Sequence, residues 1–309
     1  MEKRRVVITG MGAVTPIGST AEESWQAVRQ GVCGIAPITA YDASAQKVKL
    51  AAEVKDFDPS AHIDKRELRH LDRYVQLALV SALEAFRQSG LVMEREDPYR
   101  CGVFFASGVG GFHTIRSECL KGAEKGYDRV SPYFIPMVIA NMAAGTIAIH
   151  LGLKGMCTCP VTACASGAYA VGDAFRHIRD GYADVALCGG AEAAVDPLAI
   201  GGFTSLRALT TCEDPARASI PFDAERSGFV LGEGAGALVL ESYDHAAARG
   251  ARILGEVAGY GASCDAHHIT APAPGGEGAA AAMAAALADG GIAPEGVGYI
   301  NAHRPSPAQ

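Results

Sequence analysis

The sequence has no excess of basic residues. Lys and Arg total 27 against 34 for Asp and Glu, which gives a formal net charge of −7. Nucleic-acid binding without sequence preference needs a positive surface, because the phosphate backbone supplies most of the attraction. The overall charge therefore excludes non-specific nucleic-acid binding, although it leaves room for local basic patches.

Long apolar runs are also missing. The longest, at 135–153, contains Asn141 and His150, so we expect a buried helix there rather than a membrane span. The apolar run at 6–8 is broken by Gly10, and no small-residue cleavage site follows it. This start predicts a first buried strand and not a signal peptide.

Aromatic residues make up only 7% of the chain, whereas glycine is frequent, with 37 residues. Many glycines imply tight turns and close backbone approaches, as in layered α/β enzymes. The nine cysteines have no spacing typical of a disulfide framework, which favours reduced thiols in a cytoplasmic protein. No linker rich in serine and proline divides the chain.

The hydrophobic pattern predicts an α/β fold, because segments of strand and helix period alternate along the chain. The expected strands are 6–9, 103–106, 157–162, 185–188, 237–240, 252–258 and 297–301. The expected helices are 20–31, opened by a capping box of Thr20 and Glu23, then 68–90, 166–180 and 279–287. The pattern begins again near residue 251, so we expect a first unit at 1–250 and the start of a second at 251–309.

Two motifs suggest a ligand but fail in detail. Gly10 and Gly12 follow a strand as in a dinucleotide site, yet Thr15 replaces the third small residue, and a tight turn is the preferred interpretation. A Cys-His-His group at 264–268 lacks a second ligand pair with zinc spacing, so we expect no metal.

Cys164 is the strongest candidate for chemistry. It lies between a short expected strand and an expected helix, with Ala163, Ala165 and Gly167 around it. A helix N-terminus favours a thiolate, and its free N–H groups can hold a developing oxyanion. This is the arrangement of a nucleophile elbow. A buried structural cysteine is the alternative that the pattern leaves open.

His303 lies at the end of the last expected strand. A lone histidine is more often a polar residue with a structural partner than a catalyst. Together with Cys164, however, it is a candidate acid, base or oxyanion donor, because such partners meet only in the folded chain.

Several motifs occur in the order found in one family. They are RVVITGMG at 5–12, VTACASG at 161–167, GGAEA at 189–193, PFD at 221–223, GFVLGEGAG at 228–236 and YINAH at 299–303. From residue 4 to residue 303 the chain resembles the β-ketoacyl-acyl-carrier-protein synthases, most closely the type II elongating enzymes of bacterial fatty-acid synthesis.

The resemblance implies the thiolase fold, in which two similar halves pack as α-β-α-β-α layers, usually in a homodimer. It implies that Cys164 accepts an acyl chain and that His303 is one of two histidines serving malonyl decarboxylation. The implied reaction is a decarboxylative Claisen condensation with malonyl carrier protein, which forms 3-oxoacyl carrier protein. It implies no metal or other cofactor, because the substrates carry phosphopantetheine on the acyl carrier protein.

The resemblance also assigns binding residues. Val109, Phe203 and Thr270 would contact the substrate. The residues that would dock the acidic carrier protein are Lys65, Arg66, Arg69 and Arg207, for which a solvated helix face is the alternative.

The chain departs from the family pattern after His303. The family continues with Gly-Thr-Ser-Thr, where this chain has Arg304, Pro305, Ser306 and Pro307. The family's catalytic lysine, second histidine and phenylalanine gate do not follow, so we expect a C-terminally truncated chain with impaired activity. Two alternatives stay open: a non-catalytic truncated paralogue that binds the carrier protein or a partner synthase, and a type II polyketide ketosynthase subunit.

Overall fold

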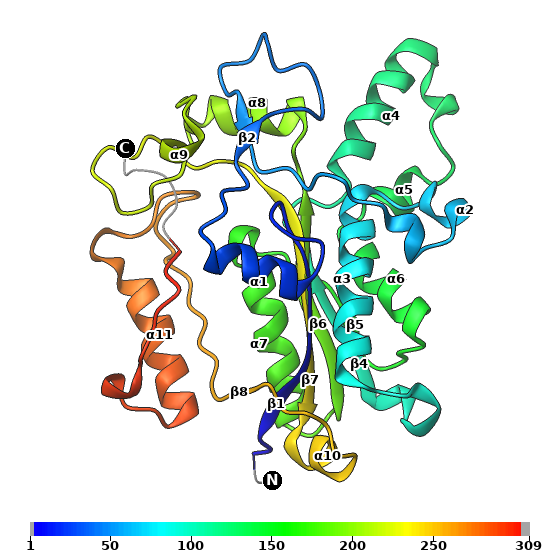
Figure 1. The fold of residues 1–309 in the computed structure, drawn as a ribbon, viewed down its shortest axis with the longest axis vertical. Coiled ribbons are helices and arrows are strands. Elements are labelled where there is room, and N and C mark those ends of the chain that lie inside the picture. The colour runs from blue at the N-terminus through cyan, green and yellow to red at the C-terminus, as the bar shows by residue number, and fades with distance from the viewer. Residues whose placement is uncertain (1–2, 304–309) are drawn as a thin grey trace.

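A six-stranded mixed sheet forms the centre of the computed structural model, which describes residues 3–303 (Figure 1). The strands lie in the order β5-β4-β6-β7-β1-β8. Their bounds are β1 Val6–Val14, β4 Cys101–Ala106, β5 Cys157–Thr158, β6 Val185–Ala193, β7 Glu233–Ser242 and β8 Gly255–Val257. β4 runs parallel to β5 and β6, whereas the remaining pairs of this sheet are antiparallel. A separate ribbon pairs β2 (Ala36–Pro37) with β3 (Leu50–Ala51).

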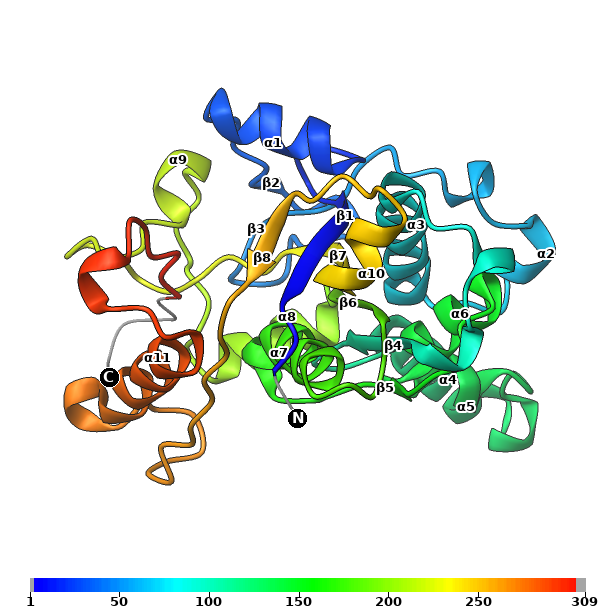
Figure 2. The same cartoon turned by 90° about the horizontal axis from the view of Figure 1, so that it is seen from below.

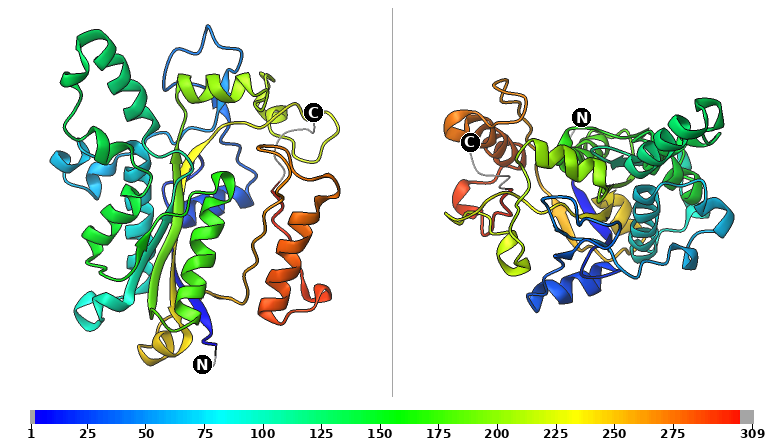
Figure 3. Two further views of the ribbon diagram at one scale, coloured as in Figure 1. Left: turned by 180° about the vertical axis from the view of Figure 1, so that it is seen from behind. Right: turned by 90° about the horizontal axis from the view of Figure 1, so that it is seen from above.

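Helices cover both faces of the sheet. α3 and α6 pack on one face and α7 on the other (Figures 1 and 3). The α-helices are α1 Ala21–Arg29, α2 Lys65–Leu68, α3 Arg73–Ser89, α4 Phe112–Lys125, α5 Phe134–Val138, α6 Met142–Leu151, α7 Ser166–Arg179, α8 Pro197–Ser205, α9 Pro215–Ala218, α10 Tyr243–Ala248 and α11 Glu277–Gly290.

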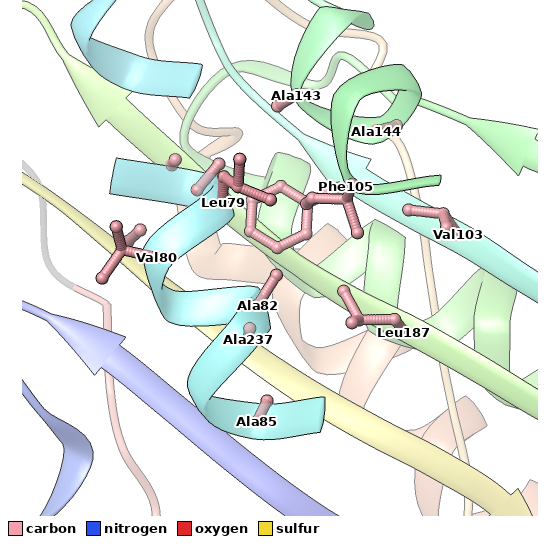
Figure 4. Packing of buried hydrophobic residues seen from close by; sticks show 14 of the residues in the cluster. Leu79, Val80, Ala82, Ala85, Val103, Phe105, Ala143, Ala144, Leu187 and Ala237 are labelled. Atoms are coloured by element: carbon pink, nitrogen blue, oxygen red, sulfur yellow. The ribbon is translucent and has the colours of Figure 1, made fainter. Parts of the chain in front are cut away.

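The core is divided between these two faces because side chains alternate along each strand. On β4, Phe105 packs with Leu79 and Ala82 of α3 (Figure 4). Its neighbour Phe104 belongs to the cluster under α7, together with Phe175. All six residues of β4 are therefore buried, as is typical of a parallel strand covered by helices on both sides.

Gly10 and Gly12 serve helix packing. Both lie inside β1, so the expected tight turn is wrong. A Cβ atom at Gly10 would lie 2.0 Å from the carbonyl oxygen of Ala85, and one at Gly12 would lie 2.0 Å from that of Ser81. The motif lets the backbone of β1 touch the backbone of α3, which a larger residue would prevent.

The same contact recurs in the second unit. A Cβ atom at Gly259 would lie 2.3 Å from the carbonyl oxygen of Ala286, and one at Gly261 would lie 2.0 Å from that of Ala282 in α11. On its other side this segment packs on α7, because Tyr260 fills the space beside Gly172. The layers therefore run from α3 through the sheet, α7 and the 258–261 segment to α11, and Figure 2 shows α7 between the sheet and α11.

Two expected helices differ from the structure. The helix predicted at 68–90 is interrupted, because Asp72 caps a new helix, α3, by accepting a hydrogen bond from the N–H of Tyr74 (3.3 Å). The end of α3 at Gly90, with a φ of 68°, is as predicted. The apolar run at 135–153 forms α5 and α6 rather than one buried helix, and Ile135 and Ile149 are exposed.

Three expected strands are shorter or missing, and one of them is β8, which covers only Gly255–Val257 of the expected 252–258. β5 ends at Thr158, because Pro160 lacks the N–H group that would continue the ladder. Residues 297–301 pair with no strand in the part of the chain that the structure describes, and they lie exposed next to α11 (Figure 1). Within residues 3–303, no helix is long and apolar enough to cross a membrane.

Candidate active site

Cys164 lies in a one-turn 3-10 helix at Ala163–Ala165, directly ahead of α7. Ala163 has a φ of 51°, a left-handed conformation that non-glycine residues rarely adopt. The hydroxyl of Ser166 holds this turn, since it accepts from the N–H of Thr162 (2.8 Å) and donates to the carbonyl of Ala163 (2.7 Å). Cys164 is exposed, so the alternative of a buried structural cysteine is wrong.

The N-terminus of α7 supplies the electrostatics of this turn. α7 has 14 residues, and its N-cap, Ala165, provides no side-chain acceptor for the first N–H groups. The N–H groups at the start of a helix carry the positive end of its dipole, which attracts an anion. The turn can therefore hold the oxyanion that forms when the sulfur of Cys164 attacks a carbonyl.

The loop at 107–111, which carries Val109, lies against the Cys164 turn. A Cβ atom at Gly108 would lie 3.6 Å from the carbonyl oxygen of Ala163. On its other side the loop touches α5, since the N–H of Gly111 donates to the carbonyl of Val138 (3.2 Å). The structure thus places the loop that carries Val109 against the turn that carries Cys164, and Val109 is 39% exposed.

Phe203 lies in α8, at the same end of the sheet as the start of α7 (Figure 1). Its ring meets that of Phe229 edge-on, with the centroids 5.5 Å apart. The two rings pack on a small cluster that includes Ile200 and Leu209 and is separate from the clusters under α3 and α7.

Thr270 and His303 belong to the second unit and are exposed. The N–H of Thr270 donates to Nδ1 of His268 (3.1 Å) within an exposed loop. Among residues 3–303, neither side chain is hydrogen-bonded to the Cys164 turn, so their meeting with Cys164 stays a prediction. The predicted departures at 304–307 lie outside the described residues.

The four predicted docking residues are all exposed but do not form one patch in the single chain. Lys65 and Arg66 lie in α2 and Arg69 caps its C-terminus, whereas Arg207 follows α8. α2 and α8 lie well apart in both Figure 1 and Figure 2. Within residues 3–303, no group of three or more His, Cys, Asp or Glu residues is placed to hold a metal.

Glu192 was not predicted as a site residue, although it lies in the GGAEA motif at 189–193. Glu192 lies near the end of β6 and accepts hydrogen bonds from Ser107 Oγ (3.0 Å) and from the N–H of Gly108 (2.8 Å). Burial raises its pKa, while these hydrogen bonds oppose the rise. A carboxylate in an otherwise apolar strand was the signal that could have identified it.

Comparison with known proteins gives consistent matches along the chain. The family model of the β-ketoacyl synthase N-terminal domain matches residues 3–246, and that of the C-terminal domain matches residues 254–308. The 3-oxoacyl-acyl-carrier-protein synthase 2 of Synechocystis sp. is 49% identical over 304 residues, which are 98% of this chain and 73% of that protein.

Solved structures share the architecture. A β-ketoacyl synthase from Burkholderia phymatum superposes with a TM-score of 0.88 at 33% identity, over 97% of this chain and 74% of that one. A ketosynthase bound to the hexaketide, in complex with its type II polyketide acyl-carrier protein, has a TM-score of 0.85 at 33% identity. That match covers 95% of this chain and 72% of the other.

Proposed function

Because the chain belongs to the β-ketoacyl synthase family, we propose that it is a cytoplasmic 3-oxoacyl-acyl-carrier-protein synthase of fatty-acid elongation. The observation that carries this proposal is the exposed thiol of Cys164 in a turn directly ahead of α7. The fatty-acid substrate is preferred over a polyketide because identity is 49% to the elongating enzyme and 33% to the polyketide ketosynthase.

In the first half-reaction, the Cys164 thiolate attacks the carbonyl carbon of an acyl thioester. The N–H groups at the start of α7 hold the negative oxygen of the tetrahedral intermediate. Collapse of this intermediate breaks the bond to the phosphopantetheine sulfur, which leaves as a thiol after it takes up a proton. The acyl chain is then a thioester of Cys164 and extends past Val109 toward Phe203.

In the second half-reaction, malonyl carrier protein loses CO₂ and forms an enolate. His303 donates a hydrogen bond to the enolate oxygen, and Thr270 contacts the phosphopantetheine arm. The enolate carbon attacks the acyl carbonyl on Cys164, and the bond to sulfur breaks. The products are the 3-oxoacyl thioester on the carrier protein and a free Cys164 thiolate. These steps need no metal and no other cofactor.

The partner proposed for both half-reactions is an acyl carrier protein. A solved ketosynthase in this fold binds such a carrier protein. Lys65, Arg66 and Arg69 would meet an acidic carrier protein at α2, with Arg207 as a second contact. We further propose that the chain acts as a homodimer. Within each chain, the first unit ends and the second begins near residue 250.

Acylation of Cys164 tests the function directly. The purified chain is incubated with hexadecanoyl carrier protein, and its intact mass is followed. We expect one acyl adduct on the wild-type chain and none on Cys164→Ser, because a serine hydroxyl here lacks thiolate character. Cys119→Ser is the matched control, since Cys119 is also an exposed free thiol and lies in α4. An adduct that persists in Cys164→Ser would overturn the assignment.

A further inference from the structure

β6 continues past the end of its neighbour β4, and this difference in length places Glu192. β4 stops at Ala106, which pairs with Gly190, whereas β6 runs on to Ala193. Glu192 therefore stands beside the 107–111 loop that follows β4, rather than beside another strand on that side. Its carboxylate accepts from a backbone N–H group of this loop, at a position where the loop has replaced the neighbouring strand.

The carboxylate of Glu192 organises that loop. Ser107 Oγ donates to one of its oxygens (3.0 Å), and the N–H of Gly108 donates to the other (2.8 Å). The N–H of Val109 also stabilises the charged form. Ser107 Oγ in turn accepts from the N–H of Gly110 (2.9 Å), so one carboxylate fixes the loop through several successive residues. Hydrogen bonds to a charged acceptor are stronger than those between neutral groups.

The loop packs closely both on the chain before it enters α6 and on Glu192. A Cβ atom at Gly111 would lie 2.1 Å from the carbonyl oxygen of Met137, and one at Gly108 would lie 2.8 Å from the Glu192 carboxylate. The following helix is also fixed, because Asp72 accepts from the N–H and hydroxyl of Thr114 (3.0 and 2.6 Å). Among these anchors, Glu192 is the one that holds the residues next to the Cys164 turn.

We propose that Glu192 is a positioning residue for the acyl chain, because it holds Val109 at a fixed place beside the Cys164 turn. This inference rests on the proposed function, since Val109 limits an acyl pocket only if Cys164 carries an acyl group. Glu192 does not touch the reacting atoms. Its loss would leave the thiol and the start of α7 unchanged while it frees the wall of the pocket.

Glu192→Gln tests this role, because the amide has the same shape but turns an NH₂ group toward a backbone donor. We expect single-turnover loading of Cys164 from hexadecanoyl carrier protein to fall about tenfold to a hundredfold, as misplacement of a positioning group typically costs. Loading from acetyl carrier protein should change less than about threefold, because a two-carbon chain does not reach the pocket wall and is not misplaced by its movement. Alkylation of Cys164 by iodoacetamide should keep its wild-type rate.

Glu53→Gln is the matched control. Glu53 is buried and accepts from the same kinds of donor, namely the hydroxyl and N–H of Thr39 and the N–H of Ala40. Among the described residues, these donors make no hydrogen bond to the 107–111 loop or to the Cys164 turn. Equal loss with both acyl chains in both variants would show a purely structural effect and overturn the proposal. The proposal would also be overturned if Glu192→Gln kept the wild-type ratio of loading rates from hexadecanoyl and acetyl carrier protein.

Amide hydrogen exchange gives a second measurement that needs no turnover. We expect faster exchange at Gly108 and Val109 in Glu192→Gln and unchanged exchange there in Glu53→Gln. Unchanged exchange in both variants would overturn the anchoring role itself. If the wild-type chain alkylates at Cys164 but accepts no acyl group, the proposed function fails, and this inference fails with it.

Discussion

At the end of the sheet opposite the Cys164 turn, a buried carboxylate joins three elements. Glu241 of β7 has no exposed surface and accepts from Thr9 Oγ1 of β1 (2.5 Å), from His245 Nδ1 (2.7 Å) and from the guanidinium of Arg249. Burial alone would raise its pKa, but the hydrogen bonds from Arg249, His245 and Thr9 lower it to about 2. The other ring nitrogen of His245 meets Glu96 (2.8 Å).

Protonated His245 stabilises the fold through this cluster. Its hydrogen bond to Glu241 raises the pKa of His245 above 6.5, burial opposes the rise, and Glu96 adds to it. The stabilisation is therefore complete below about pH 6.5 and is lost as the pH rises through the raised pKa. For Glu241 the sign is opposite: its stabilisation is present above its usual value of 4.5 and is lost as the pH falls toward about 2.

His245→Gln should therefore be less stable than the wild type at pH 6, with the difference narrowing toward pH 9. The urea midpoint, measured at several pH values, checks this prediction. Glu96→Gln is the companion variant, because it removes one carboxylate from the histidine and should move the loss of stability to a lower pH. A difference between His245→Gln and wild type that stays constant from pH 6 to pH 9 would contradict the assignment.

Backbone contact between a glycine-containing segment and a helix occurs twice in this fold. In the first unit the helix is fixed: α3 has ten buried residues, and β1 touches it through Gly10 and Gly12. In the second unit α11 makes the corresponding contact with Gly259 and Gly261 but has no buried residue. The first contact should therefore resist change more strongly than the second, because α3 cannot shift without disturbing the core.

Gly12→Ala should lower the free energy of unfolding by about 3 kcal/mol or more, since the new methyl group meets the carbonyl of Ser81. Gly261→Ala should cost less, because α11 can move. Gly145→Ala is the control: Gly145 lies inside α6 with open space around it, and alanine there should stabilise by up to about 1 kcal/mol. Equal urea unfolding curves for Gly12→Ala and the wild type would contradict the contact.

Local signals in the sequence were sufficient for many elements. Thr20 caps α1 by accepting from the N–H of Glu23 (3.1 Å), as the capping box predicts, although the Glu23 carboxylate binds Ser19 instead of Thr20. Gly90 ends α3 as predicted. These features depend on side chains only a few residues apart, so the sequence pattern contains what determines them.

Long-range contacts explain what the sequence could not predict. Gly10 and Gly12 look like a turn because their partner, α3, lies some seventy residues away along the chain. The same holds for the site: the strand–turn–helix pattern predicted that Cys164 lies in a turn directly ahead of a helix, but Glu192 is hydrogen-bonded to a loop 84 residues earlier, and no local pattern indicates that pairing. The family and the layered fold were predicted correctly, because several motifs in order carry more information than any one of them.

Across the whole molecule, the sheet has an unpaired edge at β5. β5 pairs only on its inner side, with β4, among the residues that the structure describes. Just past β5, Cys159 Sγ donates to the carbonyl of Ala140 (3.4 Å). The chain segments that meet there carry exposed apolar side chains, with Ile135 at 57%, Ile139 at 45% and Val161 at 55%. An open edge beside exposed apolar side chains favours pairing with another chain.

We predict that this edge, with the neighbouring 131–139 segment, forms the interface of a homodimer. A stable dimer of this kind buries at least about 2,000 Å² in total, which a single charge at its centre would disrupt. Ile135→Asp should therefore shift the chain from dimer to monomer at micromolar concentration, measured by light scattering after size exclusion. Val28→Asp is the matched control, because Val28 is 56% exposed on α1, and it should stay dimeric. A monodisperse wild-type monomer would show that there is no such interface. Dimers of equal stability in both variants would show that the interface lies elsewhere.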